Sequence, residues 1–189
     1  MATLREIRKR LRSVENIKQI TKAMEMVAAA RLKRAQAKAE QSRPYISKMK
    51  AILENLTSSS GDKHPFMKPR TVKKTGVFII TADRGLCGSY NTAILSTADK
   101  FLKNYTQDSV ELILMGRKAI EHYRQRAWKV RHKLFEDGEK QDIPKIKAFA
   151  HQLSEWFIKG ELDEIWIIYT RFINIMTRKV VVEKFLNIA

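Results

Sequence analysis

The chain contains little cysteine, glycine or proline: one cysteine, seven glycines and four prolines in 189 residues. Because Cys87 is the single cysteine, an internal disulfide is excluded, and the composition is typical of a protein from a reducing cytoplasm. No segment approaches the roughly 20 consecutive apolar residues that a membrane-spanning helix needs. With 44% hydrophobic residues, the chain is long enough to form one globular core and one extended arm.

The sequence also lacks recognisable motifs for catalysis, metal binding or nucleotide binding. Its four histidines share no ligand spacing, and Cys87 has no CxxC partner. The segment DRGLCGSYN, residues 83–91, follows an expected strand and opens an expected helix, where open α/β sheets often bind phosphate. It has neither the GxGxxG spacing nor a GKS or GKT ending, so we interpret Gly85 and Gly88 as turn residues. We expect no catalytic residue, no cofactor and no metal site.

Between Leu4 and Leu56 there is no glycine and only one proline, Pro44, while apolar or small residues recur every three or four positions. This pattern predicts one uninterrupted amphipathic helix. At 1.5 Å per residue the helix would be about 80 Å long, which exceeds what packs on a compact domain. We therefore expect something outside this chain to cover much of it.

The apolar stripe of this helix changes position along its length. Coiled-coil spacing holds at both ends, from Leu4 to Val14 and from Ala28 to Leu56, in one heptad register. In between, that register falls on Lys18, Thr21 and Glu25, and the apolar residues lie one position earlier. Each residue turns the helix by about 100°, so the stripe shifts by about 100° around the helix in the middle and returns to its first position after Val27. The stripe of a regular two-stranded zipper would not shift in this way. This offset stripe consists of Ile17, Ile20, Met24 and Val27.

Residues 58–74 carry the glycine, proline and serine of a loop, and they predict a linker between an arm (1–57) and a globular domain (75–189). Beyond the linker, strand and helix patterns alternate. Such alternation predicts an α/β fold, a Rossmann-like domain with a largely parallel sheet, attached to a long coiled-coil helix. The expected strands are 76–81, 110–115, 128–134, 165–169 and 178–187; the expected helices are 89–105, 117–124 and one from Asp142 to Gly160, with Ile146, Phe149, Ala150, Leu153 and Phe157 buried.

The segment NIKQITKAMEMVAAARLKRAQ, residues 16–36, resembles the N-terminal helix of the gamma subunit of F-type ATP synthases, the central rotor shaft. Four further motifs occur in that family's order and approximate spacing, which makes the resemblance specific. They are SRPY at 42–45, TADRGLCGSYN at 81–91, GRKA at 116–119 and RFIN at 171–174. The family's chain continues to a second long helix that pairs with the first, and this helix is absent from the 189 residues.

The resemblance implies a non-catalytic part of a proton-transporting enzyme complex. Its implied partners are the alpha and beta subunits of the catalytic ring, the epsilon subunit, the membrane c-ring and the chain's own C-terminal helix. The implied location is the cytoplasmic side of a bacterial inner membrane, peripheral through the complex. We expect the following subunit-interface residues: Ile17, Lys18, Ile20, Lys22, Met24, Val27, Asp83 and Arg84. The sequence leaves open whether Asp83 and Arg84 form a local ion pair or contact a neighbouring subunit.

A net charge of +17, of which residues 1–56 carry +9, leaves an alternative open. Basic residues followed by heptads are also found in basic-region zippers, whose basic helices enter the DNA major groove. Against this interpretation, positive charge continues along the arm as far as Lys48 and Lys50, well beyond a base-reading segment. We therefore expect an acidic protein partner and no nucleic acid.

Overall fold

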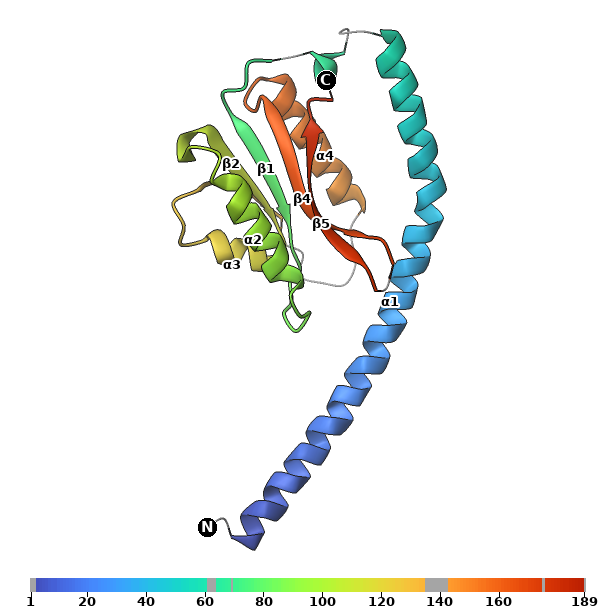
Figure 1. The fold of residues 1–189 in the computed structure, drawn as a ribbon, viewed down its shortest axis with the longest axis vertical. Coiled ribbons are helices and arrows are strands. Elements are labelled where there is room, and N and C mark those ends of the chain that lie inside the picture. Colours follow the sequence, from blue (N-terminus) through green and yellow to red (C-terminus); the bar gives the residue numbers. More distant parts are fainter. Residues whose placement is uncertain (1–2, 61–63, 69, 135–142, 175, 189) are drawn as a thin grey trace. The chain divides into compact units, whose positions relative to one another are not determined.

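The computed structural model describes residues 3–60, 64–68, 70–134, 143–174 and 176–188. The chain divides into two units, Met1–Ser59 and Ser60–Ala189. The first unit is the helix α1, Leu4–Ser60 (Figure 1), which continues past the expected end at Leu56.

Helix α1 begins with a reciprocal cap. The backbone N–H of Thr3 donates to the Glu6 carboxylate at 3.0 Å, and the N–H of Glu6 faces the Thr3 hydroxyl at 3.4 Å. This capping box satisfies two of the N–H groups that a helix start leaves unpaired. The helix then passes through Pro44 without ending, although an interior proline removes one backbone hydrogen bond.

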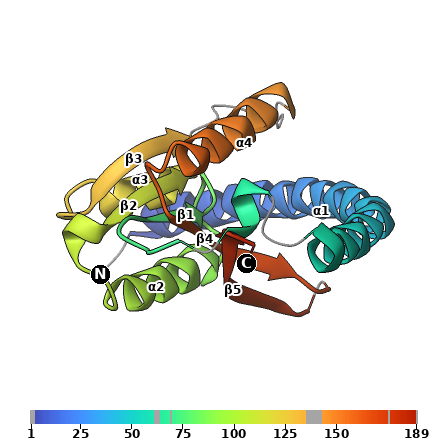
Figure 2. The ribbon, with the colours of Figure 1, turned by 90° about the horizontal axis from the view of Figure 1, so that it is seen from above.

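The second unit is a five-stranded sheet with helices on both faces, and the predicted α/β class with a largely parallel sheet is confirmed. Its strands lie in the order β3-β2-β1-β4-β5. The first four are parallel, and β5 pairs antiparallel with β4 at the edge. Figure 2 shows α2 and α4 on opposite sides of the sheet. The strands are β1 Thr75–Ile80, β2 Val110–Met115, β3 Lys129–Leu134, β4 Glu164–Phe172 and β5 Arg178–Leu186; the helices are α2 Tyr90–Leu102, α3 Arg117–Tyr123 and α4 Ile143–Ile158, with short 3-10 turns at Pro65–Met67 and Gln107–Ser109.

Each face of the sheet has its own core. Under α2 and α3 lie fully buried side chains such as Ile79, Leu112 and Ile168. Under α4 lie Phe78, Ile113 and Ile165. Strands buried on both faces explain why β1 and β2 read as nearly continuous apolar segments in the sequence.

The expected buried face of α4 is correct at three positions and wrong at two. Phe149, Leu153 and Phe157 are buried, but Ile146 is 41% exposed and Ala150 is exposed. Burial starts at Phe149 because its ring meets Phe78, with ring centroids 5.3 Å apart. Ile146 lies one turn earlier, and helical periodicity alone does not say where the sheet beneath a helix begins.

The segment predicted as the linker, 58–74, is only partly a connection. Its first residues, through Ser60, are helical. Residues 64–68 and 70–74 belong to the second unit and are hydrogen-bonded within it. Asp163 accepts hydrogen bonds from the backbone N–H groups of Lys73 and Lys74, at 2.8 and 2.9 Å. Glycine and proline mark the absence of regular structure, but they do not show whether a segment is bound to its domain.

Candidate subunit interface

Helix α1 presents its offset stripe to solvent. Ile17, Ile20, Met24 and Val27 are each exposed over more than half of their surface. None of the described side chains between residues 4 and 55 is buried. A monomeric protein rarely leaves so much contiguous apolar surface uncovered, so this stripe is a candidate contact surface for other chains.

Lys18 and Lys22 lie on the face of α1 opposite the offset stripe. At 100° per residue, Lys22 stands about half a turn from the centre of the four apolar residues. Both lysines are exposed, and neither has a carboxylate partner among the described residues. Glu15 and Glu25 lie on the same side of the helix as these lysines. The middle of α1 thus has one apolar face and one charged face that carries both signs, and the two sides of the helix differ in chemistry.

The loop after β1 is held to the start of α3 by side chains. The Asp83 carboxylate accepts from the backbone N–H of Arg117 at 2.9 Å, and the Thr81 hydroxyl accepts from the N–H of Ala119 at 2.9 Å. Asn91 accepts from the N–H of Ala82 at 3.0 Å. These bonds use the polar side chains of the loop internally, so Asp83 has a local structural role.

Arg84 and Leu86 in the same loop have exposed side chains that take no part in these bonds. Arg84 is exposed, and no ion pair of its guanidinium occurs within the described part of the chain. Leu86 is 98% exposed and has a φ of 60°, a left-handed conformation that costs a leucine roughly 1–2 kcal/mol. Sequence reasoning missed Leu86; its one signal is an apolar residue placed between the two glycines of a loop.

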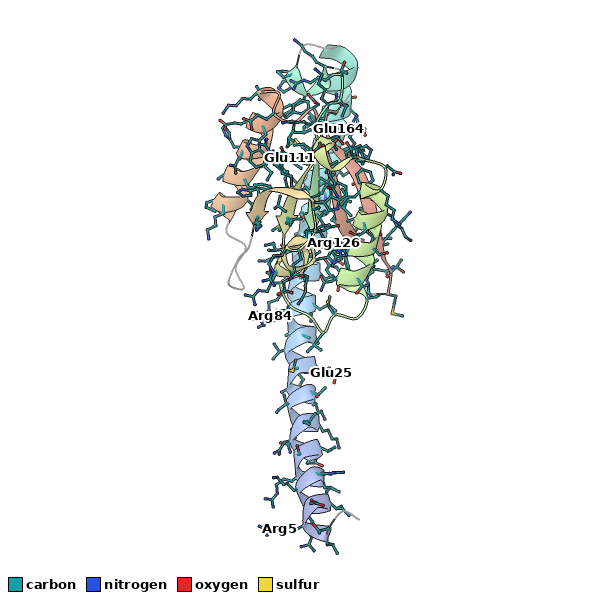
Figure 3. All side chains as sticks on the ribbon, turned by 90° about the vertical axis from the view of Figure 1, so that its left-hand side faces the viewer. Arg5, Glu25, Arg84, Glu111, Arg126 and Glu164 are labelled. Carbon is teal, nitrogen blue, oxygen red and sulfur yellow. The ribbon has the colours of Figure 1, made fainter. Side chains whose placement is uncertain are left out.

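The tip of the β4–β5 hairpin lies at the same edge of the sheet as this loop. Because β1 and β4 are parallel neighbours, their carboxyl ends meet there. At the tip, Met176 is 93% exposed, and Ile173 is 45% exposed. Figure 3 shows Arg84 at the opposite edge from Glu111 and Glu164. The carboxyl edge therefore carries exposed apolar side chains, at Leu86 and at the hairpin tip, together with the basic side chain of Arg84.

Metal binding and membrane insertion find no support in the part of the chain that the structure describes. Within the described residues, no cluster of three or more His, Cys, Asp or Glu side chains could hold a metal ion. No helix in the same part of the chain is long and apolar enough to cross a membrane. The features that stand out are contact surfaces: the two faces of α1 and the carboxyl edge of the sheet.

Comparison with known proteins identifies the family. The sequence model of the family described as ATP synthase matches residues 3–189. The chain is 56% identical over 189 residues to the ATP synthase gamma chain of Protochlamydia amoebophila, covering 100% of this chain and 66% of that protein. It is 38% identical over 196 residues to the gamma chain of Chloroherpeton thalassium, covering 100% and 64%. It thus spans slightly less than two thirds of the length of these curated relatives.

Solved structures agree with the sequence relatives. A chain of the Tetrahymena thermophila mitochondrial ATP synthase, from its central stalk and c-ring, matches with a TM-score of 0.69 and 27% identity, over 88% of this chain and 72% of that chain. A chain of the Euglena gracilis mitochondrial ATP synthase matches in fold alone, with a TM-score of 0.57 and 17% identity, over 94% and 55%. The protein therefore belongs to the ATP synthase family, among its gamma chains.

Proposed function

We propose that this chain supplies one shaft helix and the foot of the central-stalk rotor of an F-type ATP synthase, coupling proton flow to ATP synthesis on surrounding catalytic subunits. The observation that carries the proposal is the 57-residue helix α1, whose described side chains are nowhere buried. A helix of this length with exposed apolar stripes needs partners. The gamma-chain relatives and the central-stalk neighbour are consistent with what those partners would be.

The difference between the two faces of α1 gives the shaft a way to act on identical neighbours. A shaft that turns inside a ring presents Ile20 and its stripe to one subunit while Lys22 faces another. Each neighbour then has a different contact free energy, so its conformational populations shift differently. A shaft with the same chemistry all round would bias every neighbour equally and could drive no cycle.

The proposed partners follow from the same surfaces. The alpha and beta subunits would contact the middle of α1, through the offset stripe, Lys18 and Lys22. The carboxyl edge, with Arg84 and Leu86, would meet a neighbouring subunit. The globular unit would attach to the epsilon subunit and the c-ring, and a second long helix outside residues 1–189 would pair with α1. Through these contacts the chain would be a peripheral part of a membrane complex, on the cytoplasmic side of a bacterial inner membrane.

The alternative function, sequence-specific nucleic-acid binding by a basic zipper, has no support from the comparisons. The related proteins are ATP synthase gamma chains. The offset stripe also breaks the continuous heptad seam that a zipper needs. The basic residues are better explained by long-range attraction to acidic subunits, which is compatible with rotation.

The test uses reconstituted complexes that carry Ile20→Asp or Val27→Asp. If the stripe packs on partners, each substitution removes about 1.5–3 kcal/mol of apolar burial and adds the cost of burying a charge. We expect poorer assembly, or less ATP-driven proton pumping per ATP hydrolysed. Lys33→Ala, placed off both stripes, is the matched control and should be nearly neutral. If both Asp variants assemble and pump at the wild-type ratio, the stripe is not a working surface.

A further inference from the structure

Residues 64–68 and 70–74, here called the strap, follow α1 in the chain and lead into β1. The strap is bonded to the second unit at its beginning. The backbone O of Phe66 accepts from the N–H of Ile188 at 2.8 Å, and the backbone O of Lys68 accepts from the Asn187 amide at 3.2 Å. The Phe66 ring also meets the ring of Phe157 edge-on, with centroids 5.7 Å apart. The start of the strap is therefore joined to the segment that follows β5 and to the last turns of α4.

The middle of the strap is held by Arg70. Its guanidinium donates to the backbone O of Phe157 at 2.5 Å and lies 4.2 Å from the centroid of the Phe157 ring. Carbonyl groups in the last turn of a helix have no partner within the helix and attract cations. The same carbonyl also accepts from the backbone N–H of Gly160 at 3.1 Å. Arg70 therefore adds a second, charged donor at the end of α4 and holds the strap to it.

The end of the strap is held by Asp163. One carboxylate oxygen, Oδ2, accepts from the N–H groups of both Lys73 and Lys74, and the N–H of Asp163 donates back to the O of Lys74 at 2.8 Å. Hydrogen bonds to an ionised carboxylate are roughly twice as strong as neutral ones. Strand β1 is already paired with β2 and β4 on both sides. The Asp163 bonds therefore restrain the segment before the strand.

We propose that Arg70 and Asp163 are positioning residues for coupling: they hold the strap to the globular unit, so that the strap adds no free length to the connection through which torque is transmitted. This rests on the proposed rotor function. Ten unfastened residues could extend to roughly 33–36 Å, and such a tether transmits rotation poorly. The contacts of the strap distribute a force on it to α4, to Asp163 in the α4–β4 connection and to the segment after β5.

The test compares Asp163→Ala with Asp163→Asn in the assembled complex. Alanine removes the acceptor, so the Lys73 and Lys74 amides should exchange with solvent about 10- to 100-fold faster, and pumping per ATP hydrolysed should fall. Asparagine keeps an oxygen that can accept both bonds, so it should largely restore both values. Glu155→Ala, which removes an exposed α4 carboxylate paired with Lys159, should change neither value.

Arg70→Ala provides a second route if Asp163→Ala does not fold. It removes the guanidinium contacts with Phe157, leaves the Asp163 bonds in place, and should also lower the pumping ratio. The proposal is overturned if folded Asp163→Ala or Arg70→Ala complexes pump at the wild-type ratio. It is equally overturned if Asp163→Ala leaves the exchange of both amides unchanged. Failure of the wild-type chain, together with the second long helix, to assemble into a pumping complex would instead refute the rotor function itself.

Discussion

The carboxylate of Asp83, in the loop after β1, accepts a hydrogen bond from the backbone N–H of Arg117 in the first turn of α3, at 2.9 Å. Residue Gly116, at the start of α3, has no side chain that could cap the helix. Asp83 therefore acts as a cap supplied from another part of the chain. This assigns Asp83 a local role, while its neighbour Arg84 has a side chain available for an external contact.

Asp83→Ala should destabilise the isolated chain by about 0.5–2 kcal/mol, the usual cost of losing a helix cap. Asp83→Asn should recover most of that loss, because the amide oxygen accepts the same bond. Urea unfolding of the three proteins measures the difference. Equal stability of the alanine variant and the wild type would show that the Asp83–Arg117 bond contributes nothing.

Gly116→Ala should be among the most damaging single substitutions in the chain. Gly116 has a φ of 92°, and an added Cβ would lie 2.3 Å from the backbone O of Thr81. The backbone strain alone costs about 1–3 kcal/mol, before the clash. Gly85→Ala is the matched control, because a Cβ added at Gly85 would meet nothing within 4 Å. We expect little soluble Gly116→Ala protein and a Gly85→Ala protein of nearly wild-type melting temperature.

Leu86→Gly should have opposite effects on the free chain and on the assembled complex. In the free chain, it relieves the left-handed strain of Leu86 and removes a side chain with almost no contacts. The gain of roughly 1–2 kcal/mol is partly offset by the greater freedom of glycine in the unfolded state. Stability should stay equal or rise, while affinity for the partner subunits falls. Unchanged assembly would remove Leu86 from the proposed interface.

Glu111 should contribute to a loss of stability in acid. Burial raises the pKa of its carboxyl, but hydrogen bonds from Lys129 and Arg131 outweigh burial and hold the pKa below the ordinary value of 4.5. The stabilisation is therefore complete above about pH 4.5 and is lost as the pH falls through the lower folded-state pKa. Glu111→Gln should lower the free energy of unfolding at pH 7 by about 1–3 kcal/mol and flatten its acid dependence.

The control for Glu111 is Glu121→Gln, because Glu121 is an exposed carboxylate that pairs with Lys118 at 2.7 Å. Surface pairs of this kind contribute little, so stability at pH 7 should hardly change. Denaturant titrations between pH 3 and pH 7 distinguish the two variants. An acid profile for Glu111→Gln identical to that of the wild type would contradict the role assigned to Glu111.

Limited proteolysis of the isolated chain should cleave α1 before the globular unit. The described side chains of residues 4–55 are nowhere buried, so packing within the chain gives this helix little protection against local opening. The second unit has two cores and should survive longer. Mass spectrometry of early fragments locates the cuts. Equal resistance of both units in a proven monomer would contradict this expectation.

Much of the architecture could be predicted because it depends on local periodicity. The absence of glycine from Leu4 to Leu56 predicted a long helix, and the apolar segments around Phe78 and Ile113 predicted strands of a largely parallel sheet. The errors came where one element meets another. Ile146 has the helical spacing of a buried residue, yet it is exposed, because the spacing does not say how far the sheet extends beneath it.

By itself, the sequence determined the existence of the long helix, the α/β class and the offset stripe from Ile17 to Val27, since each follows from the pattern of neighbouring residues along one element. Only the tertiary structure decided that Asp83 caps α3, that Leu86 stands exposed in a left-handed conformation, and that Asp163 fastens the strap. Asp163 and Lys73 are joined by a hydrogen bond across 90 positions of sequence. Such contacts depend on how separate elements meet in space, and no local spacing records that geometry.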